Sequence, residues 1–182
     1  AIADWNEVPT GSMQPTIVEG DRILINKLAY DLRIPFTHIA LLKHADPSRG
    51  DIIVFDSAAA QKRLVKRVIG LPGDIVALRD NVLTINGQQI NYASLAANGR
   101  EKDLVENLLG VEHSVRINKL SSNLANFAPV VVPADHYLAL GDNRDNSADS
   151  RVIGFVPRQE IIGRSRQVVL SFNYENYYNN QR

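Results

Sequence analysis

Short runs of Val, Ile and Leu recur along the chain, and Gly, Pro, Asn and Asp separate them. Runs of this length between turn-forming residues are typical of β-strands rather than helices. The pattern therefore predicts a mainly β protein built from antiparallel sheets. The runs occupy residues 22–26, 51–55, 64–70, 74–78, 82–87, 130–133, 136–142, 152–156 and 167–172.

Two tight turns are predicted in the segment RDNVLTINGQQIN, one at Asp80-Asn81 and one at Asn86-Gly87. Asn and Gly accept positive φ angles, and Asn-Gly is a strong signal for a two-residue hairpin loop. The chain should therefore reverse direction twice within this segment.

One segment, EKDLVENLLG, departs from the strand pattern. It predicts a helix because four apolar residues lie at helical spacing and Gly110 suits a C-terminal cap; they are Leu104, Val105, Leu108 and Leu109. The surrounding polar region, residues 93–127, indicates an insertion. We therefore expect a discontinuous β core from residues 1–79 and 130–182, and a small inserted α+β cap domain from residues 80–129.

Composition narrows the possible functions. The chain has 182 residues and is 45% apolar, which is enough for a packed core. It carries 20 Lys and Arg against 20 Asp and Glu, so the basic excess typical of a nucleic-acid-binding protein is missing. It has no Cys, which excludes disulfides, thiolate metal sites and cysteine nucleophiles. We expect no cofactor, no metal and no nucleic acid.

The ends of the chain give a further expectation. No apolar run approaches the roughly 18–20 residues of a membrane span. The chain opens AIADWNEV, without an initiating Met or a helix cap, which suggests that an upstream segment has been removed.

Candidate chemistry begins at VPTGSMQP, where Pro9, Gly11 and Pro15 disfavour regular structure around Ser12. By itself this is an ordinary polar loop. No HExxH, GxSxG, GxGxxG, Walker or SxxK motif occurs, and none of the four His lies in a patterned setting. If Ser12 is a nucleophile, its base must be sought elsewhere.

A lysine can be that base. The segment KRLVKRVIGLPGD places Lys62, Arg63, Lys66 and Arg67 on an apolar strand. Taken alone, the segment reads as a solvated edge strand guarded by basic residues. The alternative is catalytic: arginine does not deprotonate, Lys62 borders a polar run, and Lys66 lies between Leu64 and Val68 on its face. Burial between these apolar neighbours would lower the pKa of Lys66. A decrease of roughly 3 units is enough to neutralise the amine near pH 7.

The segment GDNRDNSADSR, residues 141–151, combines three Asp, two Arg and two Ser. A calcium loop is disfavoured because an arginine interrupts the ligand register and the required Gly and Glu are missing. We expect a self-paired network instead, in which Asp145 and Asp149 neutralise nearby arginines and hold Ser147 near the base. The arginines available are Arg144, Arg151 and Arg67.

Three blocks then agree in order and content with one family. PTGSMQPTIVEGDRILINK, RGDIIVFD with RLVKRVIGLPGD, and LGDNRDNSADSRVIGFVP together resemble bacterial type I signal peptidase, also called leader peptidase. That family has a Ser-Met pair, a Lys-Arg pair before Gly-x-Pro-Gly-Asp, and a Gly-Asp-Asn-x-x-x-Ser block. The blocks span about half of the chain, and residues 93–127 carry none of them.

The resemblance implies roles for individual residues. Ser12 would be the nucleophile, Lys66 the general base and Ser147 the residue that orients the lysine amine. Thr10, where relatives often have serine, would complete an oxyanion hole with the Ser12 N–H. The substrate pockets would be lined by Met13, Ile17 and Val65, and the structural polar positions would be Arg67, Asp142, Arg144, Asp145, Asp149 and Arg151.

The resemblance also implies a function. It predicts a serine endopeptidase that removes signal peptides from exported preproteins after small A-x-A residues. Its place would be the outer, periplasmic face of the bacterial cytoplasmic membrane, at the lipid surface and as a monomer. Two alternatives remain open. One is another Ser-Lys peptidase, such as a pilin-maturing or organellar relative or a self-cleaving repressor; the other is a non-catalytic β-rich peptide-binding module.

Overall fold

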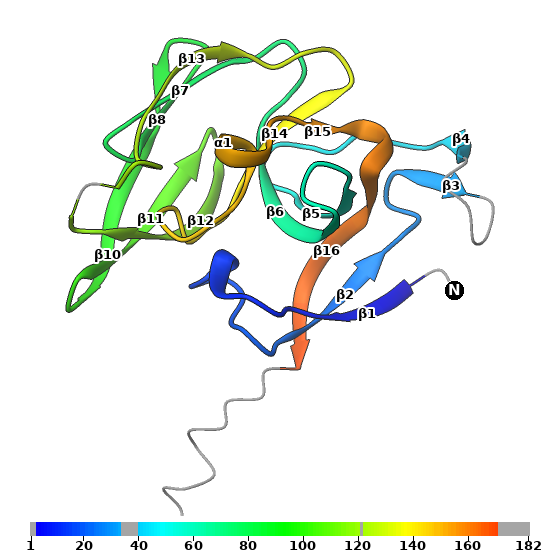
Figure 1. Cartoon of the computed structure of the whole chain (residues 1–182), viewed down its shortest axis with the longest axis horizontal. Helices are drawn as coiled ribbons and strands as arrows, with labels where there is room; N and C mark the ends of the chain where they lie inside the picture. The colour runs from blue at the N-terminus through cyan, green and yellow to red at the C-terminus, as the bar shows by residue number, and fades with distance from the viewer. Residues whose placement is uncertain (1–2, 34–39, 121, 171–182) are drawn as a thin grey trace, which may run out of the picture.

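The computed structural model describes residues 3–33, 40–120 and 122–170, and this part of the chain is mainly antiparallel β-sheet. The largest sheet has the order β1-β2-β16-β5-β6-β14-β15 (Figure 1). Its strands are β1 Ala3–Glu7, β2 Arg22–Asn26, β16 Ile161–Leu170, β5 Ile52–Ser57, β6 Lys62–Gly70, β14 His136–Leu140 and β15 Val156–Pro157. The mainly β fold predicted from the sequence is confirmed.

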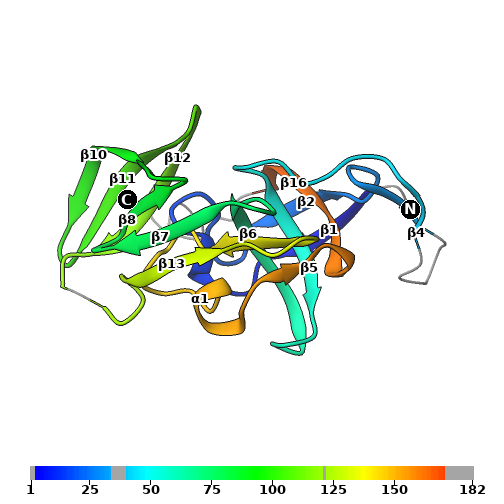
Figure 2. The same ribbon diagram turned by 90° about the horizontal axis from the view of Figure 1, so that it is seen from above.

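Smaller sheets complete the described part. One has the order β13-β7-β8-β9, another β10-β11-β12, and β3 pairs with β4. Figures 1 and 2 show β10–β12 at one end of the molecule and β3–β4 at the other. The bounds are β13 Phe127–Val131, β7 Ile75–Arg79, β8 Val82–Ile85, β9 Gln88–Gln89, β10 Asn91–Asn98, β11 Glu101–Leu108, β12 Val111–Asn118, β3 Asp31–Arg33 and β4 Ala40–Lys43.

Both predicted turns are present. Asp80 and Asn81 join β7 to β8 with φ angles of 49° and 63°. Asn86 and Gly87 join β8 to β9 with φ angles of 50° and 80°. Positive φ at two successive residues matches the right-handed twist of paired strands, which is why these residue types occur there.

The predicted helix is wrong, because Glu101–Leu108 forms strand β11. Leu104 and Leu108 point inward, as a two-residue period requires, and the inward position between them is taken by Glu106, which is 0% exposed. Because Glu106 is charged although it is buried, the alternation of apolar and polar residues expected of a strand is interrupted in the sequence. Gly110 does not cap a helix; with a φ of 102° it belongs to the turn between β11 and β12.

The predicted strand at 152–156 is only partly present. Helix α1 spans Ser150–Ile153, and β15 begins at Val156. The Asp149 side chain accepts the Arg151 N–H as an N-cap, and such a cap favours a helix start over a strand. The last two residues of the run at 167–172 lie outside the described residues. The boundaries of the inserted domain stay a prediction.

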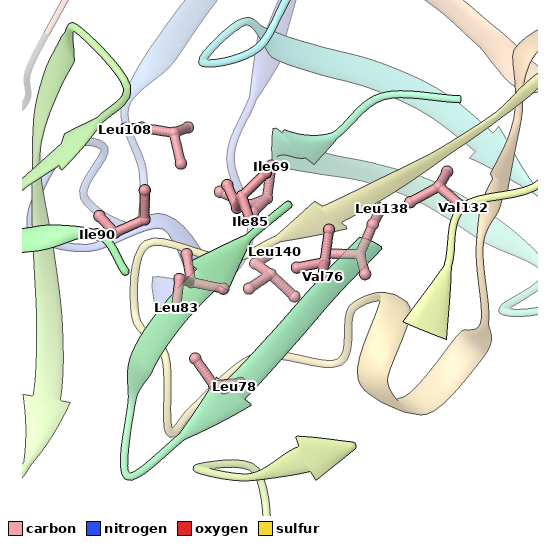
Figure 3. Packing of buried hydrophobic residues seen from close by; sticks show 10 residues of the cluster. All are labelled: Ile69, Val76, Leu78, Leu83, Ile85, Ile90, Leu108, Val132, Leu138 and Leu140. Atoms are coloured by element: carbon pink, nitrogen blue, oxygen red, sulfur yellow. The ribbon is translucent and has the colours of Figure 1, made fainter. Parts of the chain in front are cut away.

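The apolar core connects the sheets. Its largest cluster brings together side chains from β6, β7, β8, β11 and β14 (Figure 3). The members are Ile69, Val76, Leu78, Leu83, Ile85, Ile90, Leu108, Val132, Leu138 and Leu140. A separate cluster, which contains Met13 and Ile17, packs beneath the segment that carries Ser12. The core therefore fixes both β6 and the Ser12 segment.

Candidate active site

Ser12 lies in a short 3-10 turn, Gly11–Met13, between β1 and β2. The Gln14 N–H donates to the Gly11 carbonyl at 3.1 Å and closes the turn. Met13 is 0% exposed and anchors the turn in the core, whereas Ser12 is half-buried. The sequence expectation that this segment presents its serine therefore agrees with the structure.

Lys66 lies beside Ser12. Its Nζ atom is 2.8 Å from the Ser12 Oγ atom and 3.0 Å from the Val65 carbonyl oxygen, to which it donates. Strand β6 pairs with β5 from Lys62 to Arg67 and with β14 from Arg67 to Gly70. Lys62 and Arg63 are exposed, as the solvated-edge interpretation expects, whereas Lys66 is 3% exposed and does not fit it.

Burial changes the protonation of Lys66. It lowers the pKa of the amine from 10.5 to about 8, because the charged form loses its hydration. Asp149 and Asp142 favour the charged form, while Lys62 and Arg151 oppose it. Arg67, which we expected to pair with Asp145 or Asp149, pairs instead with Asp142 through two hydrogen bonds of 2.9 and 2.7 Å.

The pair opens into a cleft of about 330 Å³. One wall is formed by residues 6–12, the other by residues 62–66, and Asn146, Ser147 and Ala148 close it. Val65 lines the cleft as expected. Met13 and Ile17 do not appear among its lining residues and lie buried in the cluster below it, at 0% and 1% exposure.

A larger cleft, about 550 Å³, lies at the end of the β5–β6 hairpin. It shares Lys62 and Arg63 with the first cleft but contains neither Ser12 nor Lys66. Size alone therefore does not identify the reactive site. The described residues contain no group of three His, Asp or Glu side chains placed to bind a metal ion.

Thr10 and Ser147 flank the pair. The Thr10 hydroxyl donates to Ser12 Oγ at 3.4 Å, so it faces the reactive oxygen. The Ser147 side chain is buried and lines the same cleft as Lys66. Its hydroxyl makes no hydrogen bond of good geometry within the described chain. The role expected for Ser147 in orienting the lysine stays a prediction.

The arginines of the polar segment are paired, but not all as expected. Asp149 accepts from Arg151 at 2.8 and 2.6 Å and from the Gly141 N–H at 2.9 Å. Burial opposes ionisation of Asp149, but Arg151 and the Gly141 N–H together keep the pKa of Asp149 below its ordinary value.

Arg144 and Asp145 differ from the expectation. Arg144 pairs with Glu106, which sequence reasoning missed because it lies 38 residues away in the chain. Asp145 accepts from the Asn81 amide, the Asn118 N–H and the Ser122 hydroxyl, rather than from an arginine of the described chain.

Asn143 was also missed. Its N–H donates to the Ser12 carbonyl at 3.0 Å, and its Nδ2 atom donates to the Gly11 carbonyl at 3.1 Å. The available signal was its place next to Asp142 in the polar segment. Its backbone contacts could not be read from residue type.

Comparison with known proteins identifies the family of the chain. The family model described as signal peptidase, peptidase S26, matches residues 1–170. Signal peptidase I of Pseudomonas fluorescens is 37% identical, covering 91% of this chain and 64% of that protein. Signal peptidase I T of Bacillus subtilis (strain 168) is 35% identical, covering 91% of this chain and 73% of that protein.

A crystal structure of a signal peptidase I from Enterococcus faecalis V583 is 30% identical and covers 66% of this chain and 97% of that one, with a TM-score of 0.43. No helix of the described residues has both the length and the apolar character needed to cross a membrane. The chain spans 64% of the length of the Pseudomonas fluorescens relative. With the family model covering residues 1–170, the chain belongs to the signal peptidase family, peptidase S26.

Proposed function

We propose that this chain is the catalytic part of a serine endopeptidase that removes signal peptides from exported preproteins. Ser12 is the nucleophile and Lys66 its general base. The observation that carries the proposal is the 2.8 Å separation of Ser12 Oγ from the Nζ atom of a buried lysine. A serine hydroxyl is a weak nucleophile unless a base lies within hydrogen-bond reach.

The contacts of Lys66 suit the neutral form. A neutral amine has two N–H bonds and one lone pair. The Val65 carbonyl accepts one N–H at 3.0 Å, which turns the lone pair toward other neighbours. Ser12 Oγ then donates its proton to that lone pair as it attacks the scissile carbonyl carbon. The protonated amine passes the proton to the leaving nitrogen and becomes neutral again. It then takes a proton from a water molecule as the water oxygen attacks the acyl-enzyme, and it returns that proton to the Ser12 oxygen when the ester bond breaks.

The tetrahedral intermediate needs hydrogen-bond donors. The Ser12 N–H lies in the first turn of a 3-10 segment, so it has no acceptor within that turn. The Thr10 hydroxyl lies 3.4 Å from Ser12 Oγ, on which the tetrahedral intermediate forms. We assign both to the oxyanion hole, where one donor contributes a few kcal/mol in comparable proteases.

The substrate follows from the cleft. An extended peptide can lie between residues 6–12 and residues 62–66, and the limited volume favours small side chains next to Ser12. We assign cleavage after A-x-A residues on this basis and on the resemblance to type I signal peptidase. We further propose that the chain works as a monomer at the outer face of the cytoplasmic membrane, in contact with lipid and without nucleic acid.

The test is release of the signal peptide from a purified preprotein, followed by mass spectrometry of both products. Ser12→Ala and Lys66→Met should each abolish release while the fold is kept. Lys43→Met is the matched control, because Lys43 is an exposed lysine on strand β4 that lines neither cleft, and it should retain activity. If the Ser12→Ala variant still released the peptide, Ser12 would not be the nucleophile. The activity would then come from a contaminating protease, and the chain itself would be a peptide-binding module.

A further inference from the structure

The segment Asp142–Arg144 lies between strand β12 and the turn that carries Ser12. On one side, the Arg116 N–H donates to the Asp142 carbonyl and the Arg144 N–H donates to the Arg116 carbonyl, both at 2.8 Å. These bonds form a parallel bridge between Arg116 and Asn143. On the other side, Asn143 donates to the carbonyls of Ser12 and Gly11. The segment thus connects the β10–β12 sheet directly to the nucleophile.

Gly141, which precedes this segment, is packed closely against the backbone of Ser12. A Cβ atom placed on Gly141 would lie 2.5 Å from the Ser12 carbonyl oxygen and 2.3 Å from Ser147 Oγ. Close-packed backbone of this kind transmits a displacement instead of absorbing it. A shift of residues 141–144 therefore moves Ser12.

The position of this segment depends on Arg144, whose side chain is 0% exposed. Its Nε atom donates to the Gly141 carbonyl at 3.3 Å, and its two Nη atoms donate to Glu106 at 2.7 and 2.6 Å. A bidentate pair fixes both the distance and the orientation of a guanidinium. Glu106 on β11 therefore sets where Arg144 lies.

Each strand of the three-stranded sheet contributes one side chain at this point. Tyr92 on β10 and His113 on β12 are the register partners of Glu106 on β11. The Tyr92 hydroxyl donates to Glu106 Oε2 at 2.6 Å, and His113 Nε2 lies 3.1 Å from Glu106 Oε1. The carboxylate is held by its own sheet before it meets Arg144.

The same cluster reaches the base. His113 Nε2 is 3.9 Å from Asp142 Oδ1, and Asp142 pairs with Arg67, the residue after Lys66. The Thr16 hydroxyl donates to Asp142 Oδ2 at 2.5 Å, and its oxygen lies 3.3 Å from the Ser114 carbonyl oxygen. Through His113 and Asp142, the contacts of Glu106 thus extend to Arg67, next to Lys66, and to Thr16, in the segment that follows Ser12.

We infer that the β10–β12 sheet positions the nucleophile, and that Glu106 is the positioning residue through which it acts. The inference rests on the function proposed above. Glu106 touches neither Ser12 nor Lys66. It acts by holding Arg144, which holds residues 141–143 against the Ser12 turn.

The experiment compares Glu106→Gln with the parent chain on a signal-peptide substrate. The amide keeps the shape of the side chain but removes the charge that pairs with Arg144. Misplacement of a nucleophile by about 1 Å can cost roughly 100-fold, so we expect kcat to fall about 10- to 100-fold. KM should stay within about twofold, because the lining of the cleft is unchanged.

The matched control is Asp31→Asn. Asp31 forms a largely buried ion pair with Arg158, at 2.7 Å and with 6% and 11% of the two side chains exposed, on β3 at the far end of the molecule from β10–β12 (Figure 1). It should lower Tm to a comparable extent and leave kcat unchanged well below Tm. An equal loss of kcat in the control, or an unchanged kcat in folded Glu106→Gln, would overturn the inference.

If Glu106→Gln does not fold, Thr16→Val tests the same relay from its other end. This near-isosteric change removes only the hydroxyl that links the Ser12 segment to Asp142 and β12. We expect about a three- to tenfold loss of kcat at constant KM, and no loss would refute the relay. Failure of the proposed function is recognised separately, because the parent chain would then release no peptide or Lys66→Met would still release it.

Discussion

A Lys66→Met substitution removes an amine whose charged form is disfavoured by burial, so its effects on activity and on stability should have opposite signs. Catalysis should be lost because the base is gone. Stability near neutral pH should not fall as it does for most core substitutions. Met has a similar length and no charge, and the site is already lined by apolar side chains such as Leu64 and Val68.

The magnitude follows from the pKa of Lys66, which falls from 10.5 to about 8 on folding. That difference corresponds to a cost of about 3 kcal/mol for keeping the amine protonated in the folded state. The substitution also removes two hydrogen bonds, to Ser12 and Val65, at about 1 kcal/mol each. At pH 7 the variant should therefore be about 1 kcal/mol more stable than the parent.

The sign of the pH dependence is fixed by proton linkage. Between about pH 8 and 10.5 the unfolded parent holds a proton on Lys66 that the folded parent has released. The stability of the parent therefore rises with pH across this window, relative to the variant. Above it, the parent should be the more stable of the two by about 2 kcal/mol, the worth of its hydrogen bonds.

The assay is urea unfolding of both proteins at pH values from 7 to 10.5, followed by fluorescence of Trp5. Taking the difference between the two proteins cancels the titration of all other groups. A difference that stays constant from pH 7 to 10.5 would refute the reasoning, because Lys66 would then titrate alike in the folded and unfolded chain.

The remaining predictions concern catalysis. Since only neutral Lys66 can accept the proton, kcat/KM should rise about tenfold per pH unit below about pH 8 and level off above it; a profile that is flat from pH 6 to 9 would contradict this assignment. Gly141→Ala should lower kcat strongly, since its Cβ would lie 2.5 Å from the Ser12 carbonyl oxygen, and circular dichroism should show that the sheets are kept. Thr10→Val should lower kcat by about 100-fold with little change in KM, whereas Thr10→Ser should retain activity; equal losses in both would exclude a role for the hydroxyl.

The burial of Lys66 could be predicted from the sequence because it depends on local properties, whereas its place beside Ser12, 54 residues earlier in the chain, was expected only from the family resemblance. Strand alternation placed Lys66 between apolar neighbours, and the chemistry of amines ruled out the adjacent arginines. The turns at Asn81 and Asn86 were predictable for the same reason, since φ preference belongs to the residue itself.

The pairing of charges could not be predicted, because it depends on segments that meet only after folding. Arg144 has several carboxylates near it in the sequence, yet its partner is Glu106 on β11. The same glutamate concealed the strand, since periodicity assumes that inward positions are apolar. A buried ion pair thus produced two of the errors, one in the secondary structure and one in the site.

The position of β6 between β5 and β14 affects when the site forms during synthesis of the chain. Its neighbour β14 is made about 70 residues after Lys66, and β16 closes the sheet later still. Until those strands arrive, the lysine is an ordinary hydrated cation and the serine an ordinary alcohol. On the function proposed above, the Ser12–Lys66 pair therefore becomes competent for peptide cleavage only after β14 and β16 have been made.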